Sequence, residues 1–258
     1  MPLQLRQICL VAAHLAPVAQ DLTAILGIQR CYTDPGVGKF GLENVLMPVG
    51  RNFLEVVAPV EPDTAAERYL QRRHGDGGYM VITQADSRAT QATVRQNALD
   101  NGVRIAFESL RDDWNLCQLH PGDLQAAFLE VESDAYNDFS GYWHPVGGTG
   151  WEDKVDQSVT RDIIGVELQG ADPAALAALW ASVIGTGVTA INGVPSIALN
   201  NSQLHFVRAT DNRGAGLSGL HIQVAKRDRI LEQAQLRGCY VNHQQVDIGG
   251  VHWYLHDV

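Results

Sequence analysis

Apolar and polar residues follow a pattern that occurs four times along the chain. Each time, a stretch with the two-residue alternation of a β-strand precedes a segment with helical spacing of apolar positions, and further strand-like stretches come after it. The first strand and helix are expected at residues 5–12 and 17–27, and the second pair at residues 77–84 and 87–101. The pattern predicts four βαβββ units.

Turn residues and helix-end residues locate the remaining elements of these units. Three strands are expected after the first helix, at residues 29–34, 41–48 and 52–58, separated by glycine-rich turns. In the second half, helices are expected at residues 172–185 and 226–237. The first of these begins with an Asp-Pro pair and the second is followed by Gly, which are residues typical of helix starts and stops.

The periodicity stops after residue 133 and resumes near residue 160. The intervening stretch is rich in Gly, Ser, Asp and aromatic residues, as in a long surface connection between domains. We therefore predict a first domain at residues 1–133, a linker at 134–159 and a second domain at 160–258.

Composition and charge narrow the classes of partner. The 258 residues are 45% hydrophobic, and 19 Lys and Arg against 29 Asp and Glu give a formal net charge of −10. Nucleic acid and anionic membrane surfaces are therefore excluded as partners, because both would be repelled. No apolar run reaches the roughly 20 residues of a membrane span, and the chain does not begin like a signal peptide. We expect a cytoplasmic monomer or homodimer that binds a small-molecule ligand or substrate.

Three local sequences add to the fourfold repeat: Ile-Leu-Gly-Ile at 25–28, Asn-Phe-Leu-Glu-Val-Val-Ala-Pro at 52–59 and Ala-Asp-Pro at 171–173. With them the chain resembles the vicinal oxygen chelate superfamily, which includes glyoxalase I, extradiol dioxygenases, methylmalonyl-CoA epimerase and the bleomycin- and fosfomycin-resistance proteins. The resemblance implies an α+β fold in which four βαβββ modules pair into two cupped mixed β-sheets with helices outside. Each cup of such a fold holds a metal or a ligand.

Strand alternation places several polar side chains on the cup face. Since successive side chains point to opposite faces of a strand, Gln7, Glu55, Tyr79 and Glu130 are expected on one face of the paired sheet. A carboxylate within an apolar strand is costly unless it binds a cation or is well hydrogen-bonded. We therefore expect both Glu55 and Glu130 either to bind a cation or to be well hydrogen-bonded.

The resemblance implies that these residues occupy the four metal-ligand positions of the superfamily, three as Gln7, Glu55 and Glu130 and the fourth as Tyr79. A set without imidazole is less favourable for Zn, Ni or Fe than one that contains His. Two interpretations stay open. Gln7, Glu55 and Glu130 hold a divalent metal (Ni, Zn, Fe or Mn), or the two glutamates and Tyr79 hydrogen-bond one another in a metal-free pocket.

Two further residues of the first half are candidates for the site. His120 ends a strand before a Pro-Gly-Asp turn, where it serves either as a general acid or base or as a turn cap. Asn44 lies in the strand next to that of Glu55, and either hydrogen-bonds a substrate carbonyl or satisfies a bulge.

The second half carries fewer donors. The resemblance implies ligand positions at Gly165, His205, Gly219 and a position near Trp253, and two of these have no donor side chain. This disfavours the iron chemistry of extradiol dioxygenases. By alternation, His205 and His221 are expected to line the second cup and contact a ligand.

Two functions remain open at this point. The first is a metal-dependent lyase, isomerase or dioxygenase that acts on a small oxygenated molecule in the first cup. In such an enzyme, Glu55 or Glu130 would transfer a substrate proton, and Tyr79 or His120 would assist this transfer. The alternative is a non-catalytic binding protein of the bleomycin-resistance type. Dinucleotide-binding, P-loop and α/β-hydrolase motifs do not occur in the sequence.

Overall fold

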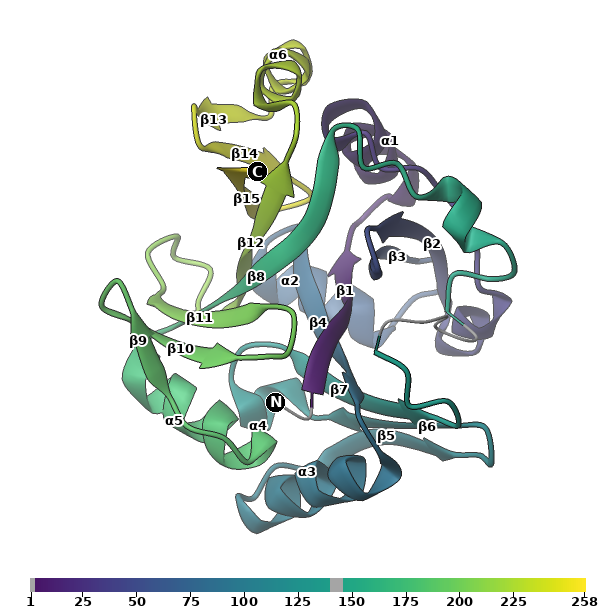
Figure 1. The fold of residues 1–258 in the computed structure, drawn as a ribbon, viewed down its shortest axis with the longest axis vertical. Coiled ribbons are helices and arrows are strands. Elements are labelled where there is room, and N and C mark those ends of the chain that lie inside the picture. Colours follow the sequence, from purple (N-terminus) through teal and green to yellow (C-terminus); the bar gives the residue numbers. More distant parts are fainter. Residues whose placement is uncertain (1–2, 140–145) are drawn as a thin grey trace. The chain divides into compact units, whose positions relative to one another are not determined.

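The computed structural model describes residues 3–139 and 146–258 and contains the repeated module (Figure 1). The second module comprises β4 (Gly77–Ala85), α3 (Arg88–Asp100), β5 (Ile105–Leu110), β6 (Trp114–Leu119) and β7 (Phe128–Asp134). The third comprises β8 (Thr160–Gly170), α5 (Pro173–Ile184), β9 (Thr189–Ile191), β10 (Val194–Ala198) and β11 (Gln203–Arg208). The fourth comprises β12 (Gly216–Val224), α6 (Arg227–Arg237), β13 (Tyr240–Asn242), β14 (Gln245–Ile248) and β15 (Val251–Asp257).

The first module departs from the prediction. It comprises β1 (Leu3–Val11), α1 (Leu15–Leu26), β2 (Leu42–Val49) and β3 (Asn52–Pro59), and the strand expected at 29–34 is reduced to an isolated bridge between Tyr32 and Leu46. The chain leaves the sheet there because Asp34 caps the 3-10 helix η1 (Pro35–Phe40) by accepting a hydrogen bond from the Gly36 amide. That strand prediction was wrong in extent.

An additional helix, α2 (Ala65–Arg73), joins the first two modules. It was not predicted, although its start carries a capping signal: Thr64 Oγ1 accepts a hydrogen bond from the Glu67 amide, and the Glu67 carboxylate accepts one from the Asp63 amide. A short helix, α4 (Pro121–Leu124), likewise precedes β7, and the 3-10 helix η2 (Trp151–Lys154) precedes β8.

Strand pairing repeats from module to module. The first strand pairs with the last in parallel, as β4 with β7, β8 with β11 and β12 with β15. The intervening strands pair antiparallel as hairpins, including β5 with β6, β9 with β10 and β14 with β15. A mixed sheet with a helix after each first strand is the predicted α+β, glyoxalase-like fold class, which is confirmed.

The described chain divides into two compact units. Unit 1 holds most of the second and third modules, and unit 2 holds most of the first and fourth. Among the described residues, unit 1 comprises 3–7, 79–139 and 165–217, and unit 2 comprises 8–78, 146–164 and 218–258. The division into residues 1–133, 134–159 and 160–258 stays a prediction, and residues 140–145 of the expected linker lie outside the described residues.

Helices cover one face of the strands in each unit. In unit 1, α3 packs on β5, β6 and β7, and α5 packs on β10 and β11. Trp180 of α5 is fully buried against Phe206 and donates through Nε1 to the Leu124 carbonyl at 3.0 Å. In unit 2, α1 packs on β2 and β3 and also contacts α6. The apolar core lies beneath these helices, which leaves the other strand face for polar side chains.

Candidate functional site

A row of acidic residues lies on one face of β7 in unit 1. Glu130, Glu132 and Asp134 alternate along this strand and are 4%, 2% and 3% exposed, respectively. Residues of β6 pair with them across the hairpin, Gln118 with Glu130 and Leu116 with Glu132. The intervening positions Leu129 and Val131 face the core, so alternation directs the carboxyl groups to the opposite face.

Two side chains of β6 hold the first two carboxyl groups. Gln118 Nε2 donates to Glu130 Oε2 at 2.5 Å, and Trp114 Nε1 donates to Glu132 Oε2 at 2.8 Å. Glu130 and Glu132 are alternate residues of β7, so their side chains lie on the same face of the strand. A negative charge on one buried carboxyl group disfavours ionisation of its neighbour.

Burial raises the pKa of Glu132 well above its usual range, the neighbouring Glu130 raises it further, and the donor from Trp114 opposes them in part. These effects favour the neutral form of Glu132. Glu132 was not among the residues expected in the site, although the Glu-x-Glu spacing puts it on the face of Glu130 and was a signal that could have found it.

Glu55 lies in a similar setting in unit 2. It pairs with Leu46 across the β2–β3 hairpin, and Asn44, two residues before Leu46, shares its face. Asn44 Nδ2 donates to Glu55 Oε1 at 2.5 Å, and Asn44 Oδ1 accepts from the Asp34 amide at 2.9 Å. The Asn44 side chain thus holds the buried carboxylate and also fixes the start of η1.

Gln7, Glu55 and Glu130 are all buried, as expected of cup residues. Gln7 and Glu130 belong to unit 1 and Glu55 to unit 2, so the three-ligand set stays a prediction. Within residues 3–139 and 146–258, no group of three or more His, Cys, Asp or Glu side chains could hold a metal ion.

Tyr79 was expected on the face of Glu130, and strand register corrects this. Ile82 of β4 pairs with Glu130 and Met80 with Phe128, so the even-numbered positions of β4 share that face, and Tyr79 lies at an alternate position. The Tyr79 ring packs edge-on against Phe128 at 5.1 Å between centroids. The sequence did not show which residues of β4 point to which face of the sheet, because every residue of this strand is buried and its apolar pattern is the same on both faces. A catalytic role of Tyr79 remains a prediction.

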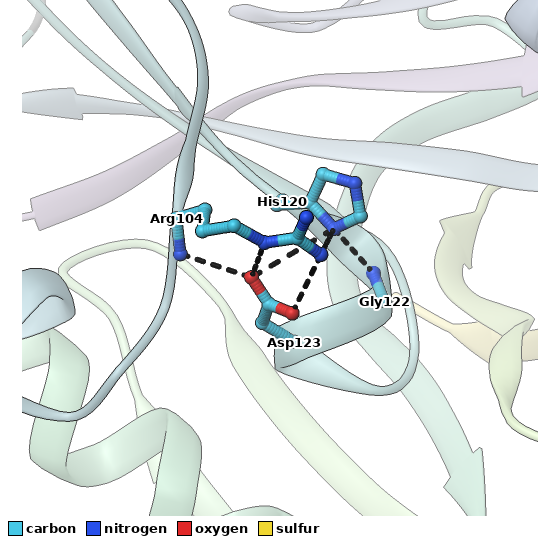
Figure 2. A network of polar contacts seen from close by, with 4 residues as sticks. All are labelled: Arg104, His120, Gly122 and Asp123. Carbon is cyan, nitrogen blue, oxygen red and sulfur yellow. Dashed lines mark hydrogen bonds and ion pairs between the residues drawn. The ribbon is translucent and has the colours of Figure 1, made fainter.

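His120 is the N-cap of α4 (Figure 2). Its Nδ1 accepts a hydrogen bond from the Gly122 amide at 3.1 Å. Figure 2 shows Asp123 beside this ring and bound to Arg104, which donates from Nε at 2.8 Å and from its second guanidinium nitrogen at 2.9 Å. These hydrogen bonds lower the pKa of Asp123. The network accounts for His120 as a turn cap, while its proposed acid–base role remains a prediction.

In the second half, His205 and His221 lie at half-buried positions in different units. His205 pairs with Glu167 of β8 and lies 3.0 Å from Ser196 Oγ through Nδ1. His221 pairs with Tyr254 of β15, and its ring stacks on the phenol at 4.8 Å between centroids. Both residues alternate with buried core residues along their strands, and their place in a cup and contact with a ligand remain predictions.

The ligand position expected near Trp253 stays a prediction. Gly219 pairs with His252, whereas the Trp253 side chain is fully buried and donates to the Ile248 carbonyl. His252 Nδ1 lies 2.8 Å from Asp247 Oδ1. Burial raises the pKa of Asp247, but the hydrogen bonds from His252 and Gln245 outweigh this and lower it overall.

Comparison with solved structures finds the same architecture in proteins of low sequence identity. A hypothetical protein from Staphylococcus aureus matches with a TM-score of 0.65 and 11% identity, over 99% of this chain and 100% of that one. A variant of 4-hydroxymandelate synthase from Streptomyces coelicolor matches with a TM-score of 0.65 and 13% identity, over 92% and 76% of the two chains. The Mn(II)-bound glyoxalase from Novosphingobium aromaticivorans matches with a TM-score of 0.65 and 11% identity, over 98% and 81%.

At these identities the comparisons show the fold, and this chain has the fold of the vicinal oxygen chelate superfamily. No family model matches the sequence, and no curated protein matches it. Across the part of the chain that the structure describes, no helix is long and apolar enough to cross a membrane.

Proposed function

We propose that this protein is an enzyme of the vicinal oxygen chelate fold that moves a proton on a small oxygenated molecule, with Glu130 and Glu132 as its base and acid. One observation carries the proposal: two buried carboxyl groups lie at alternate positions on the cup face of β7, each held by a donor from β6, and burial together with Glu130 raises the pKa of Glu132. Catalytic acids and bases are commonly adjusted toward neutral pH by such burial and like-charge pairing.

The two carboxyl groups divide the chemistry between them. The Glu130 carboxylate takes a proton from the carbon next to a substrate carbonyl group. The electron pair of the broken C–H bond moves to the carbonyl oxygen, which receives the proton of Glu132. Return of the proton from Glu130 to carbon and of the hydroxyl proton to Glu132 completes an isomerisation, and no oxidant or reductant is needed. Gln118 and Trp114 hold the two carboxyl groups in position.

A divalent metal is implied by the resemblance, and one structural neighbour is a Mn(II)-bound glyoxalase. The donors Gln7, Glu55 and Glu130 are all oxygen atoms, which does not suit Ni, Zn or Fe but meets the preference of Mn. The proposal assigns no metal to these three residues together, because Gln7 and Glu130 belong to unit 1 and Glu55 belongs to unit 2. The proton transfer above is assigned to the protein's own carboxyl groups.

The second candidate is a binding protein without catalysis. It is favoured by the amide donors at 2.5 Å to both Glu55 and Glu130, because carboxylates satisfied by their neighbours need no reaction to account for their burial. In this case the cup would select a ligand by shape and hydrogen bonding.

The test is deuterium uptake from heavy water, followed by NMR, across a panel of small 2-hydroxycarbonyl compounds, dicarbonyls and catechols. The proposed enzyme incorporates deuterium at the carbon next to the carbonyl group of at least one compound. Glu130→Gln and Glu132→Gln each lower this rate by about a hundredfold or more, and Glu43→Gln, an exposed glutamate of β2, leaves it unchanged.

No exchange with any compound, together with a ligand-induced rise in melting temperature that both glutamine variants retain, would overturn the catalytic proposal and support the binding protein. Exchange that persists undiminished in Glu130→Gln and Glu132→Gln would also refute it, because the proton would then move through other groups.

A further inference from the structure

Three buried side chains of unit 1 hold an exposed stretch of chain. This stretch, residues 135–139, directly follows β7 and is called the strap; its residues 135–138 are exposed. Its hydrogen-bond partners are Gln4 and Arg6 of β1 and Gln84 of β4, the strand next to β1 in the sheet. These three side chains are 3%, 0% and 0% exposed, respectively. Buried polar groups are costly unless they are hydrogen-bonded, so contact with the strap helps to stabilise them.

The donors converge on two neighbouring main-chain oxygen atoms. The Arg6 guanidinium donates to the Asp138 carbonyl at 3.3 Å. Gln4 Nε2 donates to the Phe139 carbonyl at 2.9 Å. Gln84 holds both donors, because its Oε1 accepts from Arg6 Nε at 2.8 Å and from Gln4 Nε2 at 3.0 Å. A guanidinium and an amide are thus fixed side by side with N–H groups directed at oxygen atoms.

A guanidinium is more than a main-chain carbonyl needs as a donor, since the neutral amide of Gln4 holds the neighbouring carbonyl. Burial of a full positive charge is costly, and a carboxylate offsets that cost better than a carbonyl, because hydrogen bonds between ionised groups are about twice as strong as neutral ones. The planar guanidinium also matches carboxylate geometry. The strap carbonyls therefore lie where the two oxygen atoms of a carboxylate would bind more strongly.

These donors are close to the proposed acid. Gln84 pairs with Glu132 across β4 and β7. Asp134, two residues after Glu132, accepts from Gln84 Nε2 at 3.4 Å through one oxygen. Its other oxygen accepts from the Tyr136 and Asn137 amides at 2.9 and 2.7 Å. Three N–H donors thus surround the Asp134 carboxylate, which weakens its repulsion of a second anion beside it.

We propose that Gln4 and Arg6 form a binding subsite for the carboxylate of a small organic acid, which displaces the strap carbonyls when it binds. The strap in its present position blocks this subsite, so binding is coupled to release of residues 135–139. The inference deepens the proposed function: it makes the substrate a carboxylic acid anchored beside Glu132. Only this link to catalysis rests on the proposed function.

Calorimetric titration of the full chain with butanoate, benzoate and lactate, each compared with its uncharged methyl ester, tests the subsite. We expect at least one acid to bind about tenfold or more tightly than its ester, because only the acid offers a charged acceptor to the guanidinium. Hydrogen–deuterium exchange of the strap should rise when that acid is bound, since the strap carbonyls lose their donors.

Two variants locate the binding, and circular dichroism establishes that each is folded. Arg6→Gln keeps an amide donor but removes the charge, so it should weaken binding of the acid about tenfold or more and leave binding of the ester unchanged. Gln4→Ala is the smaller change, and it should weaken acid binding and raise strap exchange without ligand. Arg161→Gln, which removes an exposed arginine of unit 2, is the control and should bind the acid as the wild type does.

Acids that bind no more tightly than their esters would overturn the proposal. Binding that leaves strap exchange unchanged would also overturn it, as would binding that folded Arg6→Gln and Gln4→Ala proteins retain in full. Acid binding with release of the strap, but without exchange of any carbon-bound proton, would support the subsite and refute only the catalytic proposal.

Discussion

Replacement of Glu132 by Gln should change how stability depends on pH. The carboxyl group is 2% exposed, and its pKa is raised by burial and then by Glu130. An unfolded glutamate releases its proton near pH 4.3, whereas folded Glu132 keeps it to higher pH. The folded state then binds more protons than the unfolded state, so the free energy of unfolding falls as pH rises.

The slope is about 1.4 kcal/mol per pH unit for one proton, between pH 4.3 and the pKa of Glu132 in the folded protein. Glu132→Gln has no proton to lose, so its advantage over the wild type should grow by that amount for each pH unit and then level off. The new amide oxygen can accept from Trp114, as the carboxyl oxygen of Glu132 does.

Urea unfolding of the two proteins at a series of pH values from 4 to 8 measures this difference. Glu43→Gln, which alters an exposed glutamate, serves as the matched control and should show little pH-dependent change relative to the wild type. If the wild-type and Glu132→Gln curves run parallel across this range, Glu132 does not retain a proton in the folded protein and the reasoning fails.

Three other substitutions probe the surroundings of the candidate residues, each by urea unfolding. Asn44→Ala removes the donor to Glu55 and should cost about 1–3 kcal/mol; a cost near zero would mean that this hydrogen bond contributes nothing. His120→Ala should cost about 1 kcal/mol through loss of the α4 cap, and His120→Asn should recover most of it, unless the ring acts by some other means. Gly250→Ala should cost on the order of 3 kcal/mol, because φ is +70° and the added Cβ would lie 1.9 Å from the Asp76 carbonyl oxygen; an unchanged midpoint would contradict this geometry.

The sequence predicted the regular parts of the modules well. The helices expected at 17–27 and 87–101 are α1 (Leu15–Leu26) and α3 (Arg88–Asp100), since amphipathic spacing and end residues both mark them. The fourfold repeat followed because each module begins with a strand and a helix and continues into antiparallel strands. Irregular connections were harder, and the strand expected at 29–34 failed because a capped 3-10 turn competes with sheet pairing there.

The sequence predicted side-chain contacts less well than it predicted the fold. Alternation placed Glu130 correctly relative to its core-facing neighbours, but it did not reveal that Gln118 and Trp114 of β6 hold the carboxyl pair, because this depends on hairpin register. The phase of β4 could not be derived from a strand buried on both faces. The contacts of Gln4 and Arg6 with the strap join segments far apart in sequence, which hydrophobic periodicity does not encode.

The infrared spectrum at neutral pH tests the central claim, that the pair of Glu130 and Glu132 holds a proton. A protonated carboxyl group has a carbonyl stretching band separate from those of carboxylates and amides. The account predicts this band in the wild type and in Glu43→Gln, and its loss in Glu132→Gln. A wild-type spectrum without it would show that both carboxyl groups are ionised, which would contradict the assignment of Glu132 as the acid.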